Sequence, residues 1–400
     1  MTTTIETPTG AAQTMVLNMG PQHPSTHGVL RVILELNGEI VVKAEPVIGY
    51  LHTGIEKSCE AKTYSQVITL TDRIDYLAPL SNNLGYCLAV EKLLGIEVPK
   101  RAQYTRVLLT ELTRITSHLV WLGTHAIDLG AMSVFLYTFR EREEIMKIFE
   151  YVSGQRMMTS YFRIGGLALE PPPGFLDKVR RVMDALPGHV DEYEDLLTNN
   201  RIWLGRTQGV GIISADDAIA MGCSGPMLRG SGVAYDVRKA FPYSSYDDFN
   251  FDVQTQTAGD CFARYQVRVA EIRESIKIVR QAIERVAKAD GPIRTEAPGI
   301  IPPSREEMKT SIEGLIYHFK IYTEGFAPPP GEVYQVIESP RGELGFFVAS
   351  DGSAKPYRVK VRAPSFVNLQ SLPTLAVGRL IADVVACIGT TDIVLGEVDR

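Results

Sequence analysis

Strand-like runs of apolar residues lie near both ends of the chain. They cover residues 31–36, 39–43, 333–339, 343–349 and 357–362. The Asn37-Gly38 pair between the first two runs favours a tight hairpin, because both residues tolerate positive φ. The last three runs have a period of two, are joined by turn sequences rich in Gly, Pro and Asp, and predict a β-meander.

Between these regions, apolar positions recur every three or four residues, as on one face of a helix. The longest such segment begins at Pro99 and reaches about Leu129, and its seam is typical of bundle packing. The seam consists of Leu108, Leu112, Ile115, Leu119, Leu122, Ala126 and Leu129. Further helices are predicted over 71–94, 133–154, 175–199, 260–289 and 376–388.

The order of these elements predicts an α+β fold with a central helical bundle and antiparallel β elements at both ends. Four regions are expected. They are a Thr-rich flexible tail (1–15), a β-hairpin region (16–60), the helical core (61–290) and the meander with the C-terminal segment (291–400).

The loop 20–28 is the first stretch that suggests chemistry. Its two prolines and two glycines exclude a regular helix or a continuous strand, and it presents His23 and His27 next to the predicted hairpin. A loop histidine is usually a surface or hydrogen-bonded turn residue. Two in one fixed loop favour a proton-handling site.

A polar stripe runs beside the apolar seam of the longest helix. It consists of Glu111, Arg114, His118, Trp121, His125 and Asp128. For Glu111 and Arg114, a solvated or salt-bridged face is an equally good interpretation. Asp128 is less ordinary, because the dipole at the end of a helix disfavours a carboxylate by roughly 0.3–1 kcal/mol. This carboxylate therefore needs a cationic or donating partner from elsewhere in the fold.

Composition excludes several classes of protein. The chain has 400 residues, a net charge of −6 and no long Lys/Arg block, so nucleic-acid binding is not expected. No predominantly apolar window of about 18 residues is free of charges, so a soluble or peripheral protein is expected. The five cysteines are at least 28 positions apart, which provides no local ligand set for zinc or an iron–sulfur cluster and predicts reduced, buried thiols.

Other familiar motifs are weak or absent. His23 and His27 are four apart, but Pro24 prevents the helical spacing of a zinc pair, and no metal site is expected. By spacing alone, Tyr76 is better explained as a core aromatic residue on a helix. No dinucleotide fingerprint, phosphate loop or nucleophile elbow is present.

Seven segments together resemble the signatures of one known family. They are residues 19–28, 49–57, 72–77, 121–123, 161–166, 224–226 and 396–400. The family is the D subunit, the large quinone-site component of proton-pumping NADH:quinone oxidoreductase (respiratory complex I). The resemblance extends from about Val16 to Arg400.

That family is similar to the large subunit of nickel–iron hydrogenases, so the resemblance implies a hydrogenase-like fold. Asp75, Ala78, Val394 and Glu397 stand where the hydrogenase thiolates would be. None of them is a soft thiolate donor, which excludes nickel–iron chemistry on ligand grounds. The resemblance implies that the vacated cavity is the quinone headgroup pocket, to which the C-terminal segment returns.

The resemblance also implies roles for single residues. Tyr76 and His27 would face the quinone carbonyls, and Asp128 would pair with His27. His23, Thr124 and Val394 would line the substrate.

Arg73 matches a family arginine near the terminal 4Fe-4S cluster, which belongs to the neighbouring B subunit. Many family members have a histidine where Met158 stands. The histidine is associated with a pH-linked cluster potential, so a weaker pH dependence is expected here.

The expected partners are the B, C and I subunits, the membrane-embedded H subunit, and quinone, at the cytoplasmic face of the inner membrane. NADH and FMN would act elsewhere in the complex, and this chain alone would bind no cofactor. Two alternatives stay open: a complex with ferredoxin or another electron donor, and a scaffold subunit without a redox role. The sequence does not distinguish ubiquinone, menaquinone and plastoquinone.

Overall fold

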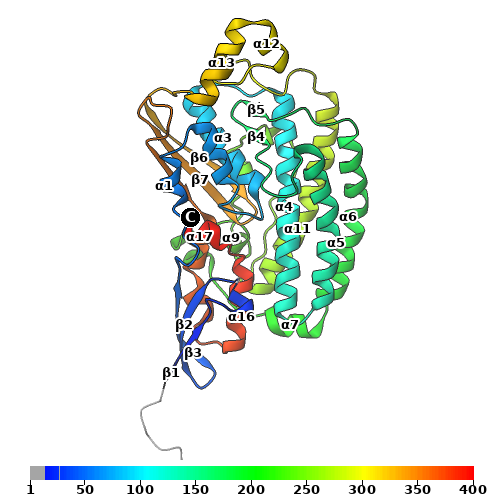
Figure 1. Ribbon diagram of the computed structural model, residues 1–400. Coiled ribbons are helices and arrows are strands. Elements are labelled where there is room, and N and C mark those ends of the chain that lie inside the picture. Colours follow the sequence, from blue (N-terminus) through cyan, green and yellow to red (C-terminus); the bar gives the residue numbers. More distant parts are fainter. Residues whose placement is uncertain (1–13, 27) are drawn as a thin grey trace, which may run out of the picture.

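A helical bundle with two antiparallel sheets beside it makes up the computed structural model, which describes residues 14–26 and 28–400. In Figure 1 the sheet β6–β8 lies to the left of the bundle, and the sheet β1–β3 projects below it. This arrangement confirms the α+β class with a central bundle and β elements at both ends.

The N-terminal sheet contains β1 (Met15–Met19), β2 (Arg31–Asn37) and β3 (Ile40–Val47), in the order β1-β2-β3. The predicted hairpin is confirmed, with Gly38 at a φ of 63° in its turn. Strand β1 is an addition that the sequence pattern did not predict. The Pro/Gly-rich loop lies between β1 and β2 and contains one short 3-10 turn, η1 (Pro24–Thr26), so the exclusion of all helix there was too strict.

The bundle consists of four long helices that match the predicted ones closely. They are α4 (Lys100–Asp128), α5 (Met132–Ser153), α6 (Phe175–Leu197) and α11 (Cys261–Lys288). Helix α4 packs against both α5 and α11, and its apolar seam from Leu108 to Leu122 is buried. Shorter elements connect the long helices: β4 (Phe162–Arg163), β5 (Gly166–Leu167), α7 (Arg201–Thr207), α8 (Ala215–Ala220), α9 (Pro226–Arg229), α10 (Val237–Ala240) and η2 (Tyr246–Asp248).

The predicted helix over 71–94 is wrong at its start. The chain forms α1 (Ile55–Cys59) and α2 (Tyr64–Thr71), then an irregular loop over 72–78, and only then α3 (Pro79–Leu94). Pro79 disfavours a helical conformation of the residue before it. The Asp75 carboxylate also accepts the backbone N–H groups of Leu77 and Ala78, which competes with helix formation. Tyr76 therefore lies on a loop.

The C-terminal region contains the predicted meander: β6 (Gly331–Ser339), β7 (Gly342–Ser350) and β8 (Arg358–Arg362), paired antiparallel. Helix α3 packs against β6 and β7. The sequence pattern missed α12 (Arg305–Thr310) and α13 (Ile312–Thr323), which lie at the top of Figure 1.

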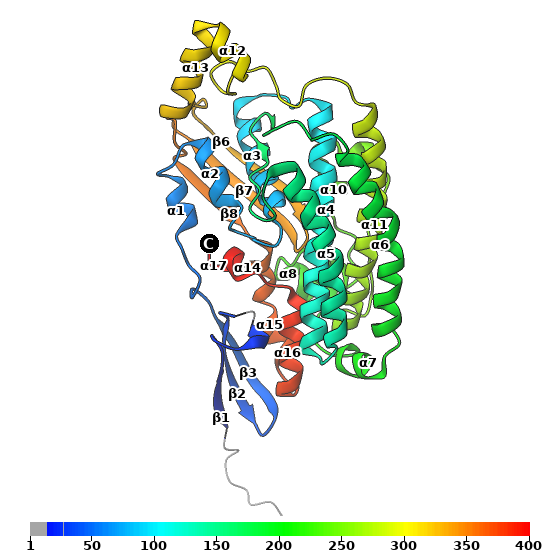
Figure 2. The ribbon, with the colours of Figure 1, turned by 45° about the vertical axis from the view of Figure 1, so that its right-hand side comes forward.

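The last part of the chain is more broken than predicted. It forms α14 (Pro364–Leu369), α15 (Leu372–Ala376), α16 (Ile381–Thr391) and α17 (Leu395–Asp399). The predicted helix over 376–388 is shifted, because Gly378 adopts a φ of 79° and separates α15 from α16. The turn from α16 to α17 brings the chain end back beside α1 and the sheet β6–β8 (Figure 2).

Two expectations from composition can be compared with the described residues, and the charged run 140–144 of α5 adds a further observation. No helix among them is long and apolar enough to cross a membrane. All five cysteines are buried and free, as predicted. The charged run Arg140–Glu144 forms largely exposed ion pairs, for example Arg140 with Glu192 at 3.0 Å and Lys147 with Glu144 at 2.6 Å.

Candidate functional site

The loop 72–78 and helix α17 meet at a close backbone contact. A Cβ atom added to Gly396 would lie 2.9 Å from the Ile74 carbonyl oxygen and 3.4 Å from Cε1 of Tyr76. Only glycine allows this approach without displacing the loop. The half-buried Tyr76 ring is therefore held against the returning C-terminal helix.

Beneath Tyr76 lies a buried cluster of charges around Arg341, which belongs to the β6–β7 turn. Its Nη1 donates to Asp75 Oδ2 at 2.6 Å and to Ser117 Oγ at 3.2 Å. Its Nε donates to the backbone oxygen of Asp392 at 2.8 Å, and its Nη2 lies 3.3 Å from Asp392 Oδ1. Burial disfavours the charged guanidinium, but the carboxylates, Asp392 first, raise the pKa of Arg341 well above its usual value. Arg341 is a permanent cation of this site.

Glu397 completes the cluster from α17. Its Oε2 accepts the Ser365 N–H at 3.0 Å. Burial raises its pKa to about 7; the Asp75 carboxylate raises it further and Arg341 opposes the shift. The predicted correspondence of Asp75 and Glu397 thus places two carboxyl groups at one buried site.

Tyr76 retains its proton in this environment. Burial raises the pKa of the Tyr76 phenol, Arg341 lowers it and Asp75 raises it, and the net shift is upward. The phenol is therefore a donor that gives up its proton only to a strong base.

Thr124 and Asp128 lie one turn apart near the end of α4. The Thr124 hydroxyl donates to the Val120 carbonyl at 2.9 Å. Asp128 is partly buried, and burial raises its pKa to about 6. No hydrogen bond or ion pair to Asp128 occurs within residues 14–26 and 28–400. His27, its predicted partner, lies outside the described residues.

His23 is exposed, and its Nδ1 accepts the Ser25 N–H at 3.2 Å. The turn η1 next to it packs against α16, and α16 packs against α4. Figures 1 and 2 both show η1, in dark blue, beside α16. The histidine loop thus lies one helix layer from α4, but no hydrogen bond or ring contact joins His23 to Tyr76 among the described residues.

Val394 and Arg73 take different positions. Val394 is buried at the start of α17, where its N–H donates to Ser365 Oγ at 3.3 Å. Arg73 is exposed on the loop 72–78. Met158 lies on a neighbouring segment with a positive φ of 51°, which is tied to this loop by a hydrogen bond from Ser160 to Asp72.

The cluster does not fit a resident nickel or iron ion. Ala78 and Val394 offer no donor atoms, and the Asp75 carboxylate is engaged by Arg341 and two backbone N–H groups. Within the described parts of the chain, no group of three or more His, Cys, Asp or Glu side chains is arranged to hold a metal ion.

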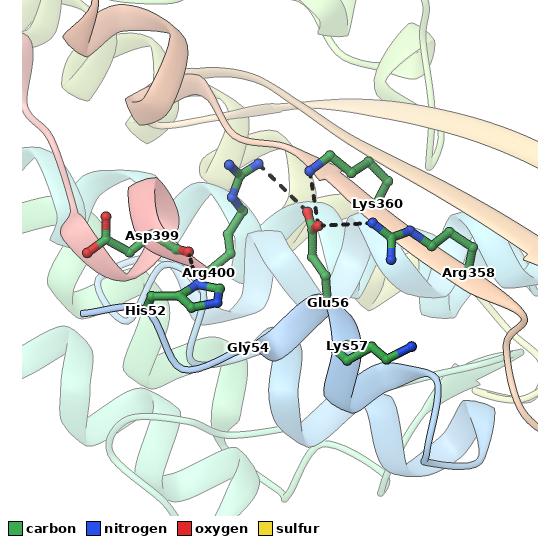
Figure 3. Close-up of a pocket in the computed structure, with 8 residues that line it drawn as sticks. All are labelled: His52, Gly54, Glu56, Lys57, Arg358, Lys360, Asp399 and Arg400. Atoms are coloured by element: carbon green, nitrogen blue, oxygen red, sulfur yellow. Dashed lines mark hydrogen bonds and ion pairs between the residues drawn. The ribbon is translucent and has the colours of Figure 1, made fainter. Parts of the chain in front are cut away.

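Two signature motifs, 49–57 and 396–400, contact each other around a hollow of about 260 Å³ (Figure 3). The Asp399 carboxylate accepts the N–H groups of Gly49 at 2.9 Å and Leu51 at 2.7 Å. Glu56 pairs with Lys360 at 3.0 Å and with Arg400 at 3.7 Å. Because these charged walls pair with one another, the contact anchors α17 and does not provide an apolar ligand site.

The polar stripe of α4 is buried, so the solvated interpretation of Glu111 and Arg114 is wrong and the salt-bridged one is confirmed. Glu111 accepts hydrogen bonds from Tyr246 at 2.6 Å and Ser275 at 2.7 Å. His118 Nε2 lies 2.9 Å from Glu271 Oε2. The stripe is a polar core that joins α4 to α11.

Sequence reasoning missed Arg341 and Asp392 as members of the site. Arg341 belongs to the Pro340-Arg341-Gly342 turn, where an arginine is normally solvent-exposed. A charged residue in a turn carries no signal of burial, so local pattern analysis could not have found it.

Comparison with known proteins identifies the family. The family model described as "Respiratory-chain NADH dehydrogenase, 49 Kd subunit" matches residues 128–400. The chain belongs to this family. It is 66% identical to the NADH-quinone oxidoreductase D 1 subunit of Solibacter usitatus, with 96% of this chain and 94% of that protein covered. It is 63% identical to the D 2 subunit of Koribacter versatilis (98% and 97% covered) and 60% identical to the D subunit of Geotalea uraniireducens (98% and 100% covered).

Membership of the 49 kDa family agrees with the geometry around Tyr76. The segments that resembled the family signatures, 72–77 and 396–400, are the two that form the contact between the loop and α17. Motifs at opposite ends of the chain thus build one site.

Proposed function

We propose that this chain is the D subunit of a proton-pumping NADH:quinone oxidoreductase and forms its quinone headgroup site. Electrons from the terminal 4Fe-4S cluster of the neighbouring B subunit would reduce quinone to quinol here. The observation that carries the proposal is the position of Tyr76. It lies on the loop 72–78 against α17, next to the buried Asp75, Arg341 and Glu397.

Reduction of a quinone to a quinol takes two electrons and two protons, so the site needs a donor for each carbonyl. Tyr76 is one donor: a phenol with a pKa of about 10 or more protonates the quinone only after electrons have made its oxygen basic. His27, protonated against Asp128, is the second. His23, Thr124 and Val394 line the bound substrate.

Proton loss from Tyr76 and from the His27–Asp128 pair leaves uncompensated charge in a poorly solvated site. We infer that this change of charge starts the signal to the membrane pump. The Arg341 cation and its carboxylates set the local field in which the change occurs.

The partners follow from the same assignment. The B subunit carries the cluster, and the exposed Arg73 guanidinium is available to stabilise the reduced cluster electrostatically. The C and I subunits and the membrane-embedded H subunit are the other partners of this chain at the cytoplasmic face of the inner membrane. NADH and FMN act elsewhere in the complex.

The test is Tyr76→Phe in the assembled complex, which removes one hydroxyl and leaves the packing nearly intact. We expect quinone reductase activity to fall by at least about a hundredfold, because one carbonyl loses its proton donor. Assembly and the cluster signal are expected to be unchanged.

Tyr334→Phe is the matched control, because Tyr334 is a partly exposed tyrosine on β6, away from the site. A wild-type rate in Tyr76→Phe would show that Tyr76 only packs, and the headgroup site would have to be placed elsewhere.

A further inference from the structure

The cluster beneath Tyr76 has more acids than bases. Three carboxyl groups, Asp75, Asp392 and Glu397, face two guanidinium groups, Arg341 and Arg268, and all five side chains are buried. If every group were ionised, one net negative charge would remain among these buried side chains. Because burying an unpaired charge is costly, one carboxyl group is expected to hold a proton.

Hydrogen bonding indicates which of the three carboxyl groups holds the proton. Asp75 accepts three donors: the Arg341 guanidinium at 2.6 Å and the N–H groups of Leu77 and Ala78 at 3.1 and 3.3 Å. Such contacts stabilise a carboxylate. Glu397 accepts only one backbone N–H, that of Ser365, and its Oε1 has no hydrogen-bond partner among the described residues. Asp392 faces two cations, because its Oδ1 lies 3.3 Å from Arg341 Nη2 and its Oδ2 lies 4.0 Å from Arg268 Nε. Glu397 has no ion pair among the described residues and is thus the least stabilised as an anion.

The charged groups that act directly on Glu397 are Asp75 of the loop 72–78 and Arg341 of the β6–β7 turn. Arg341 in turn faces Tyr76 and Asp392, and Asp392 faces Arg268 of α11. None of the Arg341 hydrogen bonds goes to Glu397; they go to Asp75, Ser117 and Asp392. Arg268 lies 4.0 Å from Asp392 and stacks over Trp121, so its charge stabilises the Asp392 carboxylate.

We propose that Glu397 is a neutral acid in the resting protein and holds the proton that restores Tyr76 after each quinone reduction. The proposal rests on the function proposed above. It assigns to Glu397 a role that acts through Tyr76, without contact to the quinone.

The proton balance is simple. The Tyr76 O–H bond breaks when the reduced quinone oxygen takes its proton, which leaves a phenolate. The Glu397 O–H bond then breaks, and a new O–H bond forms on Tyr76. This direction is downhill, because the pKa of Tyr76 is raised above 10, whereas the pKa of Glu397 is about 7. The Glu397 carboxylate finally regains its proton from solvent.

The close fit of α17 keeps the donor in place. The Gly396 contact with the loop fixes the residue next to Glu397 against the Tyr76 ring. The Ser365 N–H and hydroxyl hold Glu397 and Val394 from α14. Glu397 therefore remains beside the loop through the cycle.

The decisive variant is Glu397→Gln in the assembled complex, because the amide keeps the shape and the acceptor for the Ser365 N–H but carries no acidic proton. We expect kcat to fall about tenfold or more with KM for quinone unchanged. In the wild type, kcat is expected to fall as pH rises through about 7, where Glu397 loses its proton. This alkaline limb is expected to be missing in Glu397→Gln and to return in Glu397→Asp.

Ser365→Ala is the structural control, because it loosens the start of α17 and retains the acid. It is expected to keep the alkaline limb. Infrared spectra of the oxidised complex at neutral pH add a direct readout: the carbonyl band of a protonated acid is expected in the wild type and not in Glu397→Gln.

Three results would overturn the inference: wild-type kcat in Glu397→Gln, a pH profile that this variant leaves unchanged, or no band that depends on Glu397. Tyr76→Phe separates the two proposals. If Tyr76→Phe is inactive and Glu397→Gln behaves as wild type, only the role of Glu397 is wrong. If Tyr76→Phe keeps full activity, the quinone site itself is misplaced.

Discussion

Asp128 shows how one residue can signal function before its surroundings are known. A carboxylate in the last turn of α4 opposes the helix dipole, and burial raises its pKa to about 6. Because the folded pKa is raised, the neutral form stabilises the fold at low pH, and this contribution is lost as pH rises through about 6. Keeping Asp128 ionised near pH 7 therefore costs stability, which the proposed pairing with a protonated His27 would offset.

Asp128→Asn is expected to lower quinone reduction and proton pumping together by about tenfold or more, because the amide cannot hold a protonated His27. Both rates are measured in membranes with the assembled complex. Asp195→Asn, a change at an exposed residue of α6, serves as the control. Equal rates in the wild type and Asp128→Asn would refute the pairing.

At the scale of elements, the contact between α4 and α11 depends on buried polar side chains as well as on the apolar seam. Glu271 of α11 binds His118 of α4 and pairs with Arg229 at 2.7 Å. Burial opposes its ionisation, but Arg229 and then His118 lower the pKa of Glu271 to about 2. Removing one partner of such a network leaves the other charges buried and poorly compensated.

Glu271→Gln is expected to destabilise the α4–α11 pair by about 3–5 kcal/mol at neutral pH. Since the folded pKa is depressed below 4.5, the stabilisation by Glu271 is present above that pH and is lost as pH falls towards about 2. Hydrogen exchange of α4 and α11 amides in the complex measures the effect, with exposed Glu284→Gln as the control. A loss of protection that is equal in both variants would contradict it.

The segment 72–78 forms a loop although its apolar spacing is helical. Ile74 and Leu77 of the loop and Leu80 of α3 have helical spacing, which led to the prediction of a continuous helix. Pro79 and the Asp75 side chain instead begin a new helix at α3 and leave Tyr76 on a loop that α17 contacts. Periodicity alone does not register such competition between a side chain and the backbone.

At the scale of the whole molecule, we propose that electrons enter from a partner subunit. The five scattered cysteines provide no local set of cluster ligands, and the family resemblance places the 4Fe-4S cluster in the B subunit. The chain purified alone is therefore expected to reduce quinone no faster than the uncatalysed reaction with a chemical reductant. Spectrophotometric assay of the chain alone and of the complex, at equal concentrations, tests this expectation. Rates for the chain alone that match the complex would contradict it.

The sequence by itself determined most of the longer elements and the family. Local periodicity predicted the hairpin, the four long helices and the meander, because strand and helix patterns depend on neighbours a few residues away. The signature segments also indicated Tyr76, Asp75 and Glu397 as residues of one family site.

Only the tertiary structure decided how these residues are charged. Arg341 and Asp75 are 266 positions apart, and their contact depends on how the β6–β7 turn, the loop 72–78 and α17 pack together. Burial in that packing sets the balance of acids and bases and so decides which carboxyl holds a proton. Charge state depends on distance and desolvation in three dimensions, and neither can be read from spacing along the chain.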